Sequence, residues 1–245
     1  MWEFTIVINQ KYKYFLDYIL RETSYAKLKV ISVISETEDK SYLTMAIEVS
    51  AMQRLANIIV ECICNIILLI YKRKFFRERL DLSKCDSINK CAFLKTLVMF
   101  DSVADMEEIK QEIILNKSID IDSFYYFKLP FMREKWGEIL SIISASVYLY
   151  DNDGLTDLLK FLVNSLDNCM PKIDVYFNNG RFDIYDNKKS IIKPKEILST
   201  AEESMLSQII ELCPKVINLH CVDNISKDTI DILYSLFDKK INLSN

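Results

Sequence analysis

Residues 55–71 form the most constraining segment of this chain, a run of 17 residues that reads LANIIVECICNIILLIY. Its polar members Asn57, Glu61 and Asn65 are spaced by four residues, so they line one stripe of a helix. A carboxylate near the centre of a bilayer would cost about 3 kcal/mol. The run is also at the short end of the length that spans a bilayer. We therefore expect the buried helix of a globular core and no transmembrane segment.

The composition supports a globular protein and excludes a glycine-rich phosphate cradle, and it leaves only local binding of nucleic acid or membrane. Half of the 245 residues are hydrophobic and 27% are charged, so the chain is too apolar to be disordered. The 31 Lys and Arg residues nearly balance the 35 Asp and Glu residues, so no overall field attracts nucleic acid or anionic membrane. With only three Gly and four Pro, the chain has no glycine-rich loop that could cradle a phosphate.

The first ten residues and the cysteines indicate the compartment. MWEFTIVINQ lacks the basic start, apolar middle and cleavage site of a signal peptide, so we expect a cytoplasmic protein. The seven cysteines of the chain are scattered along the sequence, which favours reduced thiols. The one close pair, Cys62 and Cys64, would point about 200° apart on a helix and could not chelate one ion. We expect no metal and no cofactor.

The first 84 residues predict an N-terminal module. Stretches rich in Ile, Val, Thr and aromatic residues predict strands, and apolar residues at helical spacing predict helices. The predicted order is β-α-β-β-α, with strands at 3–9, 27–35 and 41–49 and helices at 12–22 and 51–80.

Residues 85–168 have almost no strand signal and predict a helical middle region. The predicted helices are at 88–100, 106–115, 133–150 and 155–166. Between the last two, either Asp151 or Asp153 could cap the helix that follows.

Residues 169–245 predict a C-terminal module of order β-β-α-β-α-β. Asn179 and Gly180 lie between two apolar runs, 172–177 and 181–185, which is the strongest short signal for a hairpin. A helix over 194–212, a strand over 216–221, a helix opened by Ser226 and a strand near Ile241 follow. We expect an α/β (α+β) fold with small mixed-sheet modules at both ends of a helical middle, as three domains or one continuous domain.

Three segments of the second half of the chain carry a family resemblance. They read MREKWGEILSIISASVYLYDNDGLTDLLKFLVNSLDNCMPKIDVYF, then NNGRFDIYD, and then MLSQIIELCPKVINLHC with a final DTIDILYSLFDKKINL. Together they resemble the YtxC-like family of sporulation proteins of endospore-forming bacteria. The resemblance runs from Met132 to the end, and its most family-like positions are Pro171, Lys172, Ile173, Asp174, Pro214, Lys215 and His220.

This resemblance implies a biological process and no mechanism, because it brings no catalytic residue or ligand with it. The chain departs from the family pattern in having one Lys after Pro214, where a pair is expected, and Cys221 where Asn is expected. We expect a sporulation-associated protein that acts by binding another protein, without catalysis.

A basic run supports an alternative function. Five cations and two aromatic rings occur within residues 72–79, and such a patch could bind phosphates and stack on bases. The cations are Lys72, Arg73, Lys74, Arg77 and Arg79. In a simpler interpretation, Phe75 and Phe76 are core residues at a helix end, and the solvated cations favour its C-terminal dipole.

His220 supports a third alternative, an enzyme. It is the only histidine, and it lies at the end of a predicted strand, where α/β folds often place functional groups. A histidine bonded to a neighbouring backbone group is the simpler interpretation.

Overall fold

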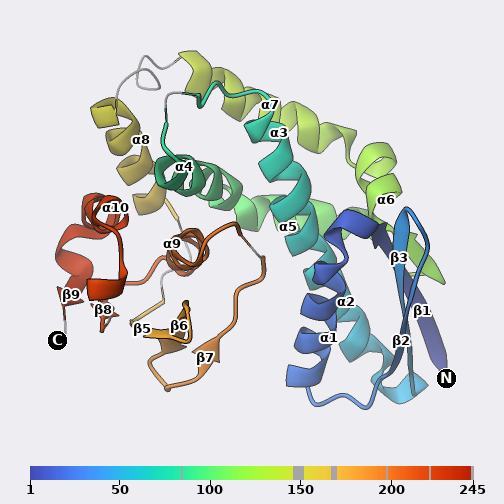
Figure 1. Ribbon diagram of the computed structural model, residues 1–245. Coiled ribbons are helices and arrows are strands. Elements are labelled where there is room, and N and C mark those ends of the chain that lie inside the picture. The colour runs from blue at the N-terminus through green and yellow to red at the C-terminus, as the bar shows by residue number, and fades with distance from the viewer. Residues whose placement is uncertain (84, 146–151, 167–169, 197, 221, 244–245) are drawn as a thin grey trace. The chain divides into compact units, whose positions relative to one another are not determined.

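The computed structural model describes residues 1–83, 85–145, 152–166, 170–196, 198–220 and 222–243 (Figure 1). The chain forms two compact units. Unit 1 comprises Met1–Lys72 and Ser102–Glu138, and unit 2 comprises Arg73–Asp101 and Ile139–Asn245. The helical region predicted for 85–168 is therefore not a compact unit of its own, because its helices are divided between these two.

The sheet of unit 1 has four strands in the order β2-β3-β1-β4. The three predicted strands are present as β1 (Trp2–Asn9), β2 (Ile31–Glu36) and β3 (Lys40–Ile47), and they pair antiparallel. β4 (Ser118–Asp120) adds parallel to β1 and was not predicted. Three residues are too few for the alternation that marks a strand in sequence.

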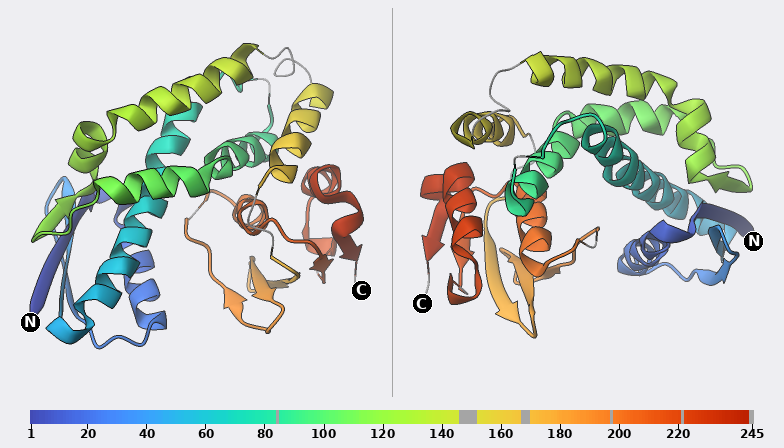
Figure 2. Two further views of the ribbon diagram at one scale, coloured as in Figure 1. Left: turned by 180° about the vertical axis from the view of Figure 1, so that it is seen from behind. Right: turned by 45° about the horizontal axis from the view of Figure 1, so that its top comes forward.

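The helices of unit 1 enclose one face of this sheet. Alternate side chains of β1 and β3, from Phe4 to Ile8 and from Leu43 to Ile47, are buried. Figure 2 shows α1 (Tyr14–Tyr25) and α2 (Met52–Ile67) against that face. The remaining elements are two 3-10 helices (Gln10–Tyr12 and Val49–Ala51), a π-helical turn (Leu68–Lys72), α5 (Ser102–Glu112), α6 (Ile121–Lys128) and the first half of α7 (Pro130–Ala145).

The apolar run predicted to be a core helix lies within a longer helix. Val49–Arg77 is the one helix among the described residues long and apolar enough to cross a membrane, and two thirds of its most apolar window is buried. Burial of this kind is typical of the central helix of a packed domain.

The sheet of unit 2 has five strands in the order β7-β6-β5-β8-β9. The predicted hairpin is confirmed, because β5 (Ile173–Asn178) pairs antiparallel with β6 (Arg181–Asp186). Its turn has positive φ at both Asn179 (51°) and Gly180 (79°). β7 (Ile191–Ile192) pairs with β6, whereas β8 (Ile217–Leu219) and β9 (Ile241–Leu243) add in parallel beyond β5.

The helices of unit 2 lie on one side of its sheet, where Ile173, Val175, Ile184, Ile217 and Leu219 are buried. These helices are α3 (Arg73–Arg77), α4 (Ser87–Met99), the end of α7, α8 (Asn152–Asn164), α9 (Ala201–Leu212) and α10 (Lys227–Phe237). Of these, α9 packs directly on the sheet, and α4 packs on α9.

Side-chain caps decide where several helices begin. Ser226 caps α10 as predicted, since its side chain accepts a bond from the Thr229 N–H. The helix predicted from residue 194 begins only at Ala201, because the Thr200 hydroxyl accepts from the Glu203 N–H and fixes the start there. For α8, Asp151 and the Asp153 side chain lie outside what the structure describes, so the predicted cap is not observed.

Candidate functional site

The basic run does not form one exposed face. Lys72 is fully buried, and its Nζ lies 2.6 Å from Asp105 Oδ2. The Arg73 guanidinium pairs with the buried Glu196 carboxylate. Lys72 therefore cannot reach a polyanion, and the prediction that it belongs to an exposed basic patch is wrong. The reason is packing, because a helix that is buried on most of its sides turns some of its cations inward.

The remaining three cations stay near the surface. Lys74 is half-buried and lies 3.8 Å from Glu78, and Arg77 is exposed. The Arg79 guanidinium sits 4.0 Å above the Phe75 ring. Phe75 and Phe76 are buried, in agreement with the simpler interpretation of this run.

Several of the family-like residues come together on the open face of the unit 2 sheet, which is the face without helices. Parallel pairing of β5 with β8 places Asp174 beside Asn218, although they are 44 residues apart in sequence. The chain continues beyond β8, where the His220 N–H donates to the Val175 carbonyl at 3.0 Å. His220 is thereby held against β5.

Asp174 is the centre of this cluster. Asn218 Nδ2 donates to its Oδ1 at 2.7 Å, and His220 Nε2 lies 3.1 Å from the same oxygen. Lys172 Nζ lies 3.4 Å from Oδ2. Partial burial alone would raise the pKa of Asp174, but the hydrogen bonds from Asn218 and His220 and the charge of Lys172 outweigh it, so the pKa is lowered.

An aromatic ring completes the cluster. The rings of Tyr176 and His220 stack with 4.4 Å between their centres and an interplanar angle of 2°. Tyr185 on β6 meets Tyr176 edge to face at 5.7 Å. We name Lys172, Asp174, Tyr176, Tyr185, Asn218 and His220 the polar face cluster.

The polar face cluster contains three of the seven family-like residues. Lys172, Asp174 and His220 meet there, whereas Ile173 and Pro214 are buried, Pro171 is exposed, and exposed Lys215 donates its backbone N–H to the Met170 carbonyl. Sequence reasoning missed Tyr176, Tyr185 and Asn218. Strand alternation could have found two of them, since Tyr176 shares a face with Asp174 in one predicted strand and Asn218 shares a face with His220 in another.

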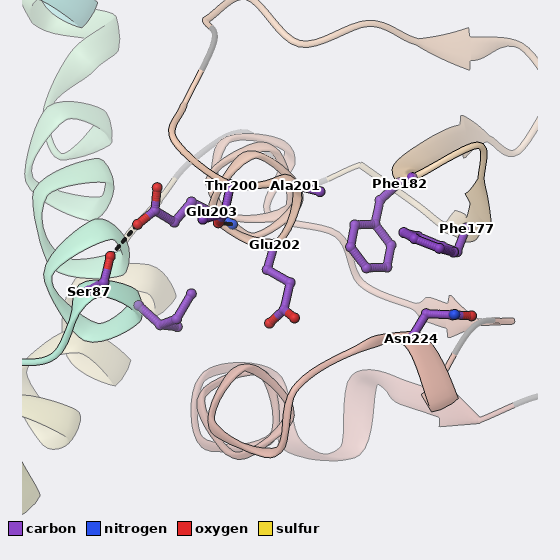
Figure 3. A pocket seen from close by; sticks show the side chains of 10 residues that line it. Ser87, Phe177, Phe182, Thr200, Ala201, Glu202, Glu203 and Asn224 are labelled. Atoms are coloured by element: carbon purple, nitrogen blue, oxygen red, sulfur yellow. Dashed lines mark hydrogen bonds between the residues drawn. The ribbon is translucent and has the colours of Figure 1, made fainter.

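Unit 2 also contains an open pocket of about 460 Å³ on the helix-bearing side of the hairpin. Figure 3 shows the Phe177 and Phe182 rings on one side of it and Glu202 projecting from the start of α9 on another. Glu202 accepts bonds from Ser226 and Thr229 at the start of α10. Burial would raise the pKa of Glu202, but these bonds outweigh it and lower the pKa.

The pocket and the polar face cluster are separate, because neither His220 nor Asp174 lines the pocket. A histidine that acts in acid–base catalysis is expected beside a cavity that holds the substrate and excludes water. Here the only histidine lies on an open sheet face.

Two of the described cysteines, Cys64 and Cys91, are deeply buried. Burial raises the pKa of Cys64 to about 12 and that of Cys91 to about 11, so both are protonated thiols at neutral pH. Cys169 and Cys221 lie outside the described residues. Within the described ranges, no group of three or more His, Cys, Asp and Glu side chains could hold a metal ion.

Comparison of the chain with protein-family models, with curated proteins and with solved structures gives no match. The resemblance to the YtxC-like family therefore stays a prediction from the sequence.

Proposed function

We propose that this protein binds another protein in the cytoplasm of an endospore-forming bacterium during sporulation, with no reaction of its own. The partner docks on the open face of the unit 2 sheet, and Tyr176 and His220 make the central contacts. The sporulation role rests on the family resemblance, and the binding role rests on the polar face cluster.

The stacked pair of Tyr176 and His220 is the observation that carries the binding role. A tyrosine fixed by a flat stack has lost its side-chain entropy before a partner arrives, and rigid aromatic rings of this kind are frequent hot spots of protein interfaces. Tyr176 is still 38% exposed, so its ring remains accessible.

The charge of the open face favours a protein over a nucleic acid as the partner. Lys172 lies 3.4 Å from Asp174, and Arg181 lies 3.5 Å from Asp183, so two cations face two carboxylates. A face without net charge gains little from the counterion release that drives binding to phosphate backbones. Mixed charges with tyrosines are typical of protein interfaces.

Site-specific photo-crosslinking tests this proposal. A photoreactive p-benzoylphenylalanine replaces Tyr176 in one variant and Tyr234 in a control, because both tyrosines are 38% exposed in unit 2 and only Tyr176 belongs to the polar face cluster. Irradiation of sporulating cells of the source organism should give a discrete crosslinked protein from position 176. The yield should be about tenfold lower from position 234 and after His220→Ala.

Equal crosslinking from positions 176 and 234 would exclude the polar face cluster as the docking surface.

Deletion of the gene should lower the spore yield while vegetative growth stays normal. A crosslink that is as strong in vegetative cells, together with an unchanged spore yield, would contradict the sporulation role and leave the binding role intact.

A further inference from the structure

The strand β2 is an unusually open edge of the unit 1 sheet. All six of its residues are exposed, including Ile31 at 65% and Val33 at 62%. The other three strands at sheet edges are much shorter, with three residues in β4, two in β7 and three in β9. Short edge strands protect a sheet from pairing with another chain, as do proline and lysine within the strand. β2 has none of these devices.

The backbone of β2 offers hydrogen-bonding groups to a further strand. The Thr37 N–H donates to the Lys40 carbonyl at 2.8 Å and closes the turn to β3. Bonded and non-bonded positions alternate along an antiparallel ladder, so Ser35, Val33 and Ile31 bond to β3. The N–H and C=O groups of Ser32 and Ile34 point toward the open edge.

The sequence around Ser32 is complementary to itself in the antiparallel direction. Residues 30–34 read VISVI, with two apolar residues on each side of Ser32. If Ser32 of one chain pairs with Ser32 of a second copy, each Ile31 lies opposite a Val33. Apolar β-branched cross-strand pairs of this kind stabilise a sheet.

The charges that flank β2 are also complementary in this arrangement. The exposed residues Lys27 and Lys29 precede the strand, and the exposed Glu36 and Glu38 lie at its end and just beyond it. Antiparallel pairing places the basic flank of each copy alongside the acidic flank of the other. A parallel arrangement would instead place like charges together.

We infer that β2 is a self-association surface, through which two copies of this chain pair antiparallel about Ser32 and join their unit 1 sheets. This interface is separate from the polar face cluster of unit 2 and does not rest on the proposed function. Because the paired segment is short, the dimer should form reversibly at micromolar protein concentrations.

Disulfide trapping tests the register on the full chain. At a bonded antiparallel pair the Cα atoms are about 5.5 Å apart, within the range that a disulfide bridges. Ser32→Cys should therefore give a reducible covalent dimer under mild oxidation. Ser35→Cys is the matched control, since it is an exposed serine of the same strand. In this register the two copies of residue 35 would be about 20 Å apart and should not crosslink.

Analytical ultracentrifugation of the unmodified protein and of Val33→Lys provides the second measurement. Val33→Lys places a charge at the centre of the interface and should weaken dimerisation about tenfold or more, without changing the melting temperature. The inference is overturned if the protein stays monomeric up to about 100 µM, where such an edge pair should form. It is equally overturned if Ser35→Cys crosslinks as fast as Ser32→Cys, or if Val33→Lys dimerises like the unmodified protein.

Discussion

In both units, helices cover one face of a small sheet and leave the other face open, but the side chains on the two open faces differ. The open face of unit 1 carries β-branched side chains, such as Thr5, Thr44 and Val33, and one ion pair across strands, between Lys40 and Asp120. The open face of unit 2 carries the polar face cluster, with ionisable groups joined across strands. The edge strand β2 of unit 1 is suited to strand pairing, whereas the open face of unit 2 is suited to recognition by side chains.

The buried ion pairs of the two units show a similar contrast. In unit 1, one carboxylate serves several donors, because Asp105 contacts Lys72, Lys135 and the Trp136 N–H. In unit 2, one lysine is shared by two carboxylates, since Lys95 Nζ lies 3.1 Å from Glu196 and 2.6 Å from Glu211. Loss of one carboxylate should therefore have different consequences in the two units.

The largest expected effect is that of Asp105→Asn in unit 1. It removes the charge of the buried carboxylate 2.6 Å from Lys72 Nζ, which should cost about 3–5 kcal/mol in the free energy of unfolding. Glu211→Gln in unit 2 should cost only about 1–2 kcal/mol, because Glu196 still faces Lys95.

Urea titrations can follow the two units separately. Both tryptophans, Trp2 and Trp136, belong to unit 1, so their fluorescence reports on that unit. The only histidine, His220, reports on unit 2 by its proton NMR signals. Equal losses for Asp105→Asn and Glu211→Gln would show that the two networks share their charges in the same way.

The second expected effect is the loss of unit 2 stability in acid. Burial opposes the ionisation of Glu211, but Lys95 and Lys195 outweigh it and lower its pKa from 4.5 to about 2. Since the pKa is lower in the folded state, the stabilisation is present above about pH 4.5 and is lost as the pH falls toward 2.

Measurement of the urea midpoint at pH 7, 4.5 and 3 checks this effect. The His220 signals should show a midpoint that falls steeply below pH 4.5, and Glu211→Gln should flatten that slope. If the variant keeps the slope of the unmodified protein, other carboxylates carry the acid sensitivity.

The smallest expected effect distinguishes the two hairpins. Gly180 has a φ of 79°, so Gly180→Val strains the turn of unit 2 and should cost about 1–2 kcal/mol. Asp39, in the turn between β2 and β3 of unit 1, is not among the residues with positive φ, so Asp39→Val should change stability by less than about 0.5 kcal/mol. Similar losses in both variants would mean that backbone strain does not distinguish the turns.

Local signals in the sequence determined most of the secondary structure. The Asn179 and Gly180 turn, the Ser226 cap and the apolar helix at 55–71 each depend on residues within a few positions of one another, so their chemistry can be read directly. Elements defined by few residues or by distant partners were missed, including β4, β7 and α6. The strand β4 exists because β1 offers it an edge, and no local pattern records that edge.

Tertiary structure alone decided which charged side chains face solvent and can contact a partner. Five cations in eight residues predicted a basic patch, yet the helix that carries Lys72 turns it toward Asp105, a residue 33 positions away. In the same way, His220 gained Asp174 and Tyr176 as neighbours because parallel pairing joined β5 to β8. A sequence fixes the charge of each side chain, but whether that charge faces water or a buried counter-charge depends on segments that meet only after folding.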